Sequence, residues 1–200
     1  MNISFAPLET LPEIAIGSQS LLISFHDPPR ELRRSPELDI TARSVSVRPE
    51  VADLIDGNLG EITPFHQTFH VYAHGVGPES AVLAPDWESR LRKAETPGMN
   101  GASVYGLSPG DLAYAKLAAG RPKDIEFVGG MIRHEIVSQI SVGRLIGSCS
   151  DQELRSRLSE RFAIAVGLTQ SRDERGKTPG LSDPVLRAMD GGAPEQLPGR

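Results

Sequence analysis

The sequence feature that most constrains the fold and function of this chain is a pair of acidic residues, Glu37 and Asp39, separated by one apolar residue. They lie in Arg34-Ser-Pro-Glu-Leu-Asp-Ile40, between a basic loop and a hydroxyl-rich run, where we predict a short strand. Side chains alternate across a strand, so both carboxylates point to one face while Leu38 and Ile40 turn toward the core. Two oxygen ligands on a rigid edge suit a divalent cation and leave room for phosphate oxygens. The plainer interpretation is a solvated strand face.

A break in an apolar run lies upstream of the acid pair. Ile14-Ala-Ile-Gly-Ser-Gln-Ser-Leu-Leu22 begins like a buried strand, breaks at Gly17-Ser18 and continues with helical spacing. Glycine lets the backbone approach a ligand closely, and free amides at the start of a helix attract phosphate. We therefore predict a phosphate-facing turn ahead of a metal-holding strand. A tight turn without a ligand is the alternative.

Composition sets the broad class. The 200 residues, 38% of them hydrophobic, suffice for one sizeable core. The formal net charge of -5 argues against broad coating of nucleic acid. The single cysteine, Cys149, excludes an intrachain disulfide framework and fits a reducing compartment. The N-terminal residues do not resemble a signal peptide and no apolar run reaches the length of a membrane span, so we expect a cytoplasmic protein with no membrane partner.

Hydrophobic periodicity, prolines and glycines predict a mixture of strands and helices. We expect strands at 14–16, 38–42, 69–75, 80–83 and 103–107, with a hairpin joining the third and fourth, and helices at 18–26, 49–57, 111–119, 122–132 and 151–166. Residues 96–101 are the expected mobile loop. The chain is predicted to form one domain over residues 1–168, followed by a disordered tail at 169–200.

Four segments together resemble a known family. They are Ile-Gly-Ser-Gln-Ser-Leu-Leu at 16–22, Leu-Arg-Arg-Ser-Pro-Glu-Leu-Asp-Ile at 32–40, Leu-Ala-Pro-Asp-Trp-Glu-Ser-Arg-Leu at 83–91 and Leu-Ser-Pro-Gly-Asp-Leu-Ala-Tyr-Ala-Lys-Leu-Ala-Ala-Gly-Arg-Pro-Lys-Asp at 107–124. As a set they look like the nucleotidyltransferase-like proteins related to the abortive-infection (AbiEii-type) toxins of bacterial toxin–antitoxin systems. The resemblance covers residues 14–145 and is more specific for fold than for substrate.

The resemblance implies an α+β, polymerase-beta-like nucleotidyltransferase fold: a small mixed sheet flanked by helices, with a helical C-terminal part. It also implies an activity, the Mg²⁺-dependent transfer of a nucleoside monophosphate from a nucleoside triphosphate to an RNA, such as tRNA, or to a protein acceptor. A neutralising antitoxin is the partner that such a system would supply.

The resemblance assigns roles to residues in this chain. Glu37 and Asp39 are the expected metal ligands and, with Lys116 and Asp124, the candidate catalytic residues. The expected nucleotide-binding residues are Gly17, Ser18, Arg34 and Arg121. Lys116 is placed to touch phosphate, and Asp124 to orient Lys116 or a second ligand. The plainer interpretations are a surface lysine with an apolar stem for Lys116, and a first-turn helix acid for Asp124.

Two departures from the family pattern keep alternatives open. Glu37 replaces the commoner aspartate, and the third carboxylate expected on a neighbouring strand is not evident. The strand predicted at 69–75 instead places His70, Tyr72 and His74 on one face, and histidine is a poor ligand for Mg²⁺. The alternatives are a non-catalytic protein of the same fold that binds nucleotides or other proteins and, more remotely, a zinc cluster of His66, His70 and His74.

Overall fold

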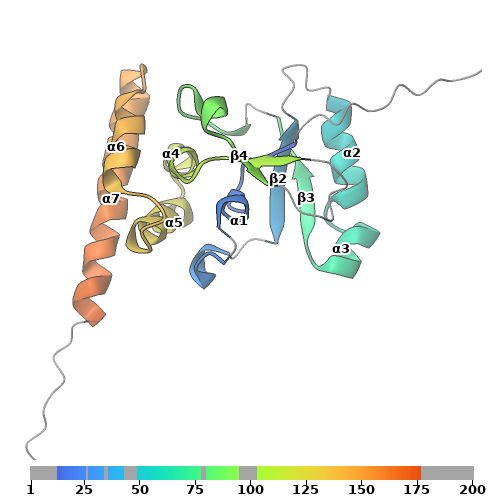
Figure 1. Ribbon diagram of the computed structural model, residues 1–200, viewed down its shortest axis with the longest axis horizontal. Coiled ribbons are helices and arrows are strands. Elements are labelled where there is room, and N and C mark those ends of the chain that lie inside the picture. Colours follow the sequence, from blue (N-terminus) through green and yellow to red (C-terminus); the bar gives the residue numbers. More distant parts are fainter. Residues whose placement is uncertain are drawn as a thin grey trace, which may run out of the picture.

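The computed structural model describes residues 13–25, 27–33, 36–42, 49–77, 80–94 and 103–176. Within them, five strands form one mixed sheet in the order β3-β2-β1-β5-β4 (Figure 1). The strands are β1 Glu13–Ala15, β2 Glu37–Ala42, β3 Tyr72–Gly75, β4 Arg92–Ala94 and β5 Val104–Gly106. β1 is antiparallel to β2 and parallel to β5, whereas β2 is parallel to β3 and β4 is antiparallel to β5. The α+β class and the small mixed sheet are confirmed.

Helices flank this sheet and build the C-terminal part. They are α1 Ser20–Ser24, α2 Pro49–Leu59, α3 Pro64–Phe69, α4 Pro109–Ala119, α5 Pro122–Arg133, α6 Gln139–Gly147 and α7 Gln152–Gly176, with 3-10 turns η1 Arg30–Leu32 and η3 Trp87–Arg90. Proline opens α2, α3, α4 and α5, at a position where its missing N–H removes no helical hydrogen bond. Ser108 and Ser138 cap α4 and α6 with their side chains.

The helices divide into two groups around the sheet. α2 and α3 lie beside β3 at one end, whereas α4 to α7 lie together at the other (Figure 1). α5 packs between α4 and α7, and α4 also contacts α1. The core that results is apolar and includes the fully buried side chains Ile14, Leu21, Leu107, Leu112, Leu117, Val128, Met131 and Leu158. Within this core α1 contacts both α4 and the strands β4 and β5, and so connects α4 to the sheet, while α5 contacts η1.

The strand predicted at 69–75 is wrong in its first half. Thr63 caps α3 by accepting the N–H of His66 at 3.3 Å, Pro64 opens the helix, and Phe69 is its last residue. His70 then adopts a left-handed conformation with φ of 58° and ends the helix, so β3 begins only at Tyr72. The cap-and-proline signal at Thr63 therefore outweighs the β-propensity of the residues that follow.

Other boundaries also differ from the sequence predictions. The helix expected at 18–26 is only the five-residue α1, and residues 81–83 form no strand, so the predicted hairpin is wrong. β4 was missed because its Arg92 and Lys93 look like a solvated loop, although charged residues are common on edge strands. α6 was also missed, and α7 runs through Gly176, beyond the helix end predicted at residue 166. The loop predicted at 96–101 and residues 177–200 lie outside the described residues.

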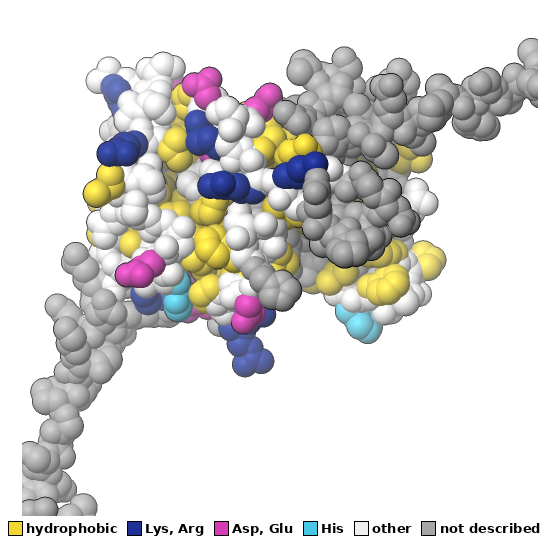
Figure 2. All heavy atoms as spheres, viewed as in Figure 1, with side chains coloured by type: hydrophobic (Ala, Val, Ile, Leu, Met, Phe, Trp, Pro, Cys, Tyr) yellow, Lys and Arg dark blue, Asp and Glu magenta, His cyan; other side chains and the backbone are white. Residues whose placement is uncertain are grey.

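Among the residues that the structure describes, basic side chains do not gather into one patch on the face of the molecule shown in Figure 2. On the face shown in Figure 2, Lys and Arg side chains form separate small groups with polar and apolar surface between them. This distribution agrees with the acidic net charge of -5. A surface of this kind does not favour nonspecific coating of nucleic acid.

Candidate functional site

A cleft of about 550 Å³ lies where β2 and the turn after β1 face α4 and α5. This volume is within the range of small-molecule binding sites. The cleft is lined by Ser18, Glu31, Leu32, Pro36, Glu37, Asp39, Lys116, Arg121, Lys123, Asp124, Glu126, Phe127 and Arg133. Charged side chains of both signs therefore converge on one space, as a site for a phosphate ester with its counter-ion would require.

Asp39 lies directly against the turn that follows β1. The N–H of Ile16 donates to the backbone oxygen of Asp39 at 3.1 Å, which ties the turn to β2. Ser20 Oγ donates to the oxygens of Ala15 and Gly17 at 2.8 and 2.7 Å and closes the turn. A Cβ atom at Gly17 would overlap Oδ2 of Asp39. Glycine is therefore required here so that the carboxylate can occupy its position.

The turn offers less to a phosphate than its sequence predicted. α1 has five residues, too few for its N-terminus to act as a strong anion site. Ser18 nevertheless lines the cleft, so its hydroxyl is the group of this turn that a ligand would meet.

The acid pair meets a histidine from the neighbouring strand. The β2–β3 register places Asp39 opposite His74 and Glu37 opposite Tyr72. Ligand atoms of Glu37, Asp39 and His74 all lie within 4.8 Å of one another, and His74 Nδ1 lies 3.5 Å from Glu37 Oε1. Two carboxylates and an imidazole at this spacing can hold a divalent cation. His74 thus takes the place on the adjacent strand where a third carboxylate was sought.

Asp56 on α2 completes this cluster and was missed by the sequence analysis. Its Oδ1 accepts the N–H of Gly75 at 2.7 Å, and its Oδ2 lies 3.7 Å from His74 Nε2. α2 reaches β3 because Gly75 has no side chain: a Cβ there would lie 2.5 Å from the Cα and oxygen of Ala52. The close approach of α2 therefore brings Asp56 to the imidazole.

The zinc cluster of His66, His70 and His74 is wrong. His66 lies inside α3, where its Nδ1 accepts the N–H of Ile62 at 3.1 Å, and His70 is the left-handed residue that ends this helix. The three residues do not share one strand, so their spacing in sequence does not bring them to one face.

Asp124 binds the two basic groups that the sequence placed beside it. This carboxylate is almost fully buried; it accepts from Arg121 Nε at 2.5 Å and lies 3.4 Å from Lys116 Nζ. Burial opposes its ionisation, but the Arg121 hydrogen bond and the charges of Lys116 and Arg121 together lower the pKa of Asp124. In turn, the hydrogen bond to Asp124 raises the pKa of Arg121, with smaller contributions from the charges of Asp39 and Glu37.

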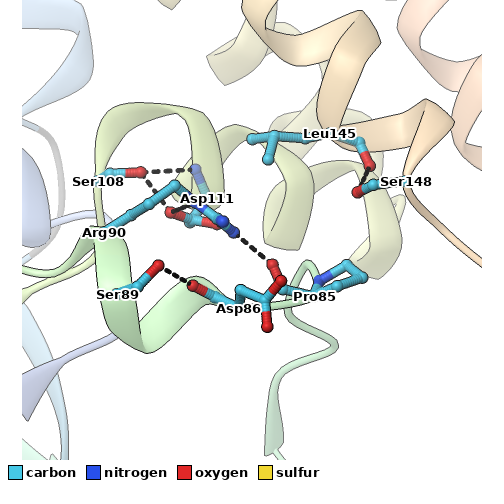
Figure 3. A network of polar contacts seen from close by, with 8 residues as sticks. All are labelled: Pro85, Asp86, Ser89, Arg90, Ser108, Asp111, Leu145 and Ser148. Carbon is cyan, nitrogen blue, oxygen red and sulfur yellow. Dashed lines mark hydrogen bonds and ion pairs between the residues drawn. The ribbon is translucent and has the colours of Figure 1, made fainter.

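A second ion pair fixes the start of α4, the helix that carries Lys116. Asp111 is fully buried and accepts from Arg90 Nη2 at 2.7 Å and Nε at 3.0 Å, as well as from Ser108 Oγ (Figure 3). Arg90 Nη2 also donates to the oxygen of Pro85 at 2.7 Å. This network joins η3 to the first turn of α4 and so sets the position of the helix along the cleft.

The structure brings most of the predicted site residues together. Ser18, Glu37, Asp39, Lys116, Arg121 and Asp124 line the same cleft, and Gly17 adjoins it; Arg34 lies outside the described residues. Sequence reasoning did not single out Lys123, Phe127 and Arg133 as cleft residues, nor Asp56, which has no motif around it to mark it. Whether the predicted residues perform the assigned roles stays a prediction.

A mixed five-stranded sheet flanked by helices, with its charged cleft, is consistent with a nucleotidyltransferase-like fold. The chain belongs to the family described as "Nucleotidyltransferase of unknown function (DUF6036)", whose sequence model matches residues 7–164. No curated protein and no solved structure matches the chain. None of the helices in the described ranges has both the length and the apolar character needed to cross a membrane.

Proposed function

We propose that this protein is a nucleotidyltransferase that moves a nucleoside monophosphate from a nucleoside triphosphate to a hydroxyl of an RNA or protein acceptor, with a divalent cation as cofactor. The observation that carries this proposal is the meeting of Glu37 and Asp39 with Lys116, Arg121 and Asp124 in one cleft. The family described above supports the transferase class.

Glu37 and Asp39 are the residues that would hold the cation, for which Mg²⁺ is the expectation from the family resemblance. The fit rests on the donor set: two carboxylates on one face of β2, with Gly17 leaving space for Asp39 Oδ2. When bound, such an ion neutralises charge on the leaving pyrophosphate and lowers the pKa of the attacking hydroxyl. The protein contributes the rigid strand that keeps the two ligands in place.

The basic side chains of the cleft would bind the triphosphate. Lys116 is only 15% exposed and is held by Asp124, so its ammonium group is positioned before any ligand arrives. Arg121 is 58% exposed and retains donors beyond those given to Asp124, and Lys123 is exposed beside it. Prepositioned donors lose little entropy on binding, which favours tight recognition of phosphate oxygens.

In the proposed reaction the acceptor oxygen forms a bond to the α-phosphorus while the bond from that phosphorus to the bridging oxygen breaks. Pyrophosphate leaves, and the hydroxyl releases its proton. The cleft residues hold the reacting groups in line, which accounts for most of the catalysis in phosphoryl transfer.

The finer parts of the proposal rest on the sequence resemblance alone. By that resemblance the protein is an AbiEii-type toxin of a bacterial toxin–antitoxin system, acting on tRNA, another RNA or a protein, with an antitoxin as its neutralising partner. The alternative is a non-catalytic module of the same fold that binds nucleotides or proteins. The observation that favours this alternative is the histidine at the position where a third carboxylate was expected.

The test is a thermal-shift and calorimetric screen of the purified protein against ATP, CTP, GTP and UTP, each with and without a divalent cation. We expect stabilisation that needs both one nucleotide and the cation, and its loss in Glu37→Ala with Asp39→Ala. The exposed pair Glu153→Ala with Glu160→Ala on α7 removes the same charge away from the cleft and should change nothing. A well-folded wild-type protein that responds to no nucleotide would refute the proposal, while nucleotide binding without product formation from any acceptor would favour the non-catalytic module.

A further inference from the structure

His74 faces the acid pair from the adjacent strand, and its placement is fixed by the sheet rather than by a loop. It lies in β3 directly opposite Asp39, in a parallel register that also pairs Glu37 with Tyr72. Paired residues of neighbouring strands project to the same face, so the three potential ligands lie on one face of the sheet. Their ligand atoms lie within 4.8 Å of one another.

The two ring nitrogens of His74 face different groups. Nδ1 lies 3.5 Å from Glu37 Oε1, on the side of the acid pair, and Nε2 lies 3.7 Å from Asp56 Oδ2. Asp56 is itself anchored, because its other oxygen accepts the N–H of Gly75 at 2.7 Å. A histidine that binds a metal usually presents its second nitrogen to a carboxylate, which fixes the tautomer and the ring orientation. Asp56 stands in that position.

We infer that His74 is a third protein ligand of the cation held by Glu37 and Asp39, that Asp56 is its positioning residue, and that the site prefers Mn²⁺ to Mg²⁺. The inference rests on the proposed function for the metal site itself and adds its ligand set and its ion preference.

The preference follows from the donor atoms. Mg²⁺ demands oxygen ligands in near-ideal octahedral geometry and keeps much of its water, whereas imidazole suits first-row transition ions. Two carboxylates and one imidazole form a mixed ligand set, to which Mn²⁺ binds with a smaller loss of affinity than Mg²⁺. An oxygen ligand at position 74 would remove this difference, so the histidine is the residue that sets the ion preference.

The experiment combines electron spin-echo spectroscopy of bound Mn²⁺ with competitive titrations of Mn²⁺ and Mg²⁺, using the full chain. We expect nitrogen modulation from a coordinated imidazole in the wild-type protein and a higher affinity for Mn²⁺ than for Mg²⁺. In His74→Asp the nitrogen modulation should vanish and the ratio of the two affinities should fall. His70→Asn is the matched control, because it removes an exposed histidine nearby and keeps a residue that tolerates the left-handed conformation.

Asp56→Asn tests the positioning role separately. Asparagine Oδ1 can still accept the N–H of Gly75, so the change removes the charge that faces His74 while keeping the anchor to β3. We expect the nitrogen modulation to persist while Mn²⁺ affinity falls by about 10–100-fold, the usual effect of losing the group behind a ligand. An unchanged affinity would overturn the role of Asp56.

The outcomes separate this inference from the proposed function. One outcome is that Mn²⁺ binding is lost in Glu37→Gln with Asp39→Asn while the wild-type spectrum shows no nitrogen modulation. This result overturns His74 as a ligand and leaves the proposed function standing. Nitrogen-coordinated Mn²⁺ in a protein that binds none of the four nucleotides supports the metal site and refutes the proposed function. Failure of the well-folded wild-type protein to bind Mn²⁺ overturns this inference, while the nucleotide screen decides the proposed function separately.

Discussion

Replacing Gly17 by alanine should disable the proposed metal site while leaving the fold intact. Oδ2 of Asp39 occupies the space of the missing side chain, so a Cβ atom at Gly17 would overlap it. The new atom would also lie 3.1 Å from Cγ and 3.3 Å from Cβ of Asp39. These three nearest atoms all belong to one side chain, which must rotate away and take a metal ligand with it.

The expected loss of stability is moderate because opposing terms partly cancel. Rotating Asp39 off its preferred geometry costs about 0.5–1.5 kcal/mol. The remaining close contact with its Cβ brings the total toward the roughly 1–3 kcal/mol typical of overpacking. Reduced freedom of the unfolded chain returns about 0.4–1 kcal/mol, since the backbone at Gly17 has no positive φ that would strain alanine. The net loss of unfolding free energy should therefore be about 1 kcal/mol.

Two measurements check this expectation: urea unfolding for stability, and calorimetric titration of Mn²⁺ for the site. Mn²⁺ affinity should fall at least about tenfold, as it does when a ligand is misplaced. In an Asp39→Ala background the alanine at Gly17 should have no further effect on binding, because the ligand is already gone. Gly143→Ala on α6 is the control: its Cβ would meet nothing within 4 Å, and about 0.5–1 kcal/mol of stabilisation with unchanged binding is expected.

Either of two results would refute the reasoning. Wild-type affinity for Mn²⁺ in Gly17→Ala would mean that Asp39 does not need its present position to act as a ligand. A loss of unfolding free energy above about 3 kcal/mol would mean that the backbone of the turn, rather than the Asp39 side chain, has to move.

The ion pairs in and beside the cleft give three further predictions. Asp124→Asn should lower the unfolding free energy by about 1–3 kcal/mol, because it leaves the mostly buried ammonium of Lys116 without its charged partner; urea unfolding measures this. In the folded protein the pKa of Asp124 is lowered below 3.8. The ionised carboxylate should therefore contribute fully to the unfolding free energy above that pH, and this contribution should disappear as the pH falls through the pKa of the folded state. Unfolding curves of wild type and Asp124→Asn between neutral pH and pH 3 should therefore converge toward acid, and a constant gap would contradict the assignment. Arg90→Ala should cost about 3–5 kcal/mol by leaving the buried Asp111 carboxylate without its cation, whereas Arg157→Ala, at an exposed pair, should stay within about 0.5 kcal/mol.

The parts of the fold that the sequence predicted are those with strong local signals. The proline and the capping serine before α4 mark its start, and its last residue coincides with the predicted one because Gly120 adopts the left-handed conformation there. β4 and α3 escaped because their signals compete: charged residues cover an edge strand, and the β-branched and aromatic residues after Pro64 favour a strand although Thr63 and Pro64 start a helix. Local pattern alone does not decide such cases.

The candidate site shows the same division between local and long-range information. Glu37 and Asp39 share a face because a strand alternates, and Lys116 and Asp124 lie within 3.4 Å because the turn at Gly120 reverses the chain between two helices. Asp56 reaches the site for a different reason. Its position depends on the close packing of α2 on β3, and no residue near Asp56 in the sequence predicts this contact.

The long-range contact changes how the departure at His74 is to be understood. Viewed alone, a histidine in place of a carboxylate suggests lost chemistry, because it weakens a site built for Mg²⁺. In the proposed site Asp56 Oδ2 lies 3.7 Å from the second nitrogen of His74, on the side where metal-bound imidazoles usually have a carboxylate. One oxygen of Asp56 has a structural partner in the N–H of Gly75, and the other faces His74 and is the oxygen that the proposed site would use. The Mn²⁺ experiment decides whether these residues hold an ion, and the nucleotide screen decides whether the cleft is active.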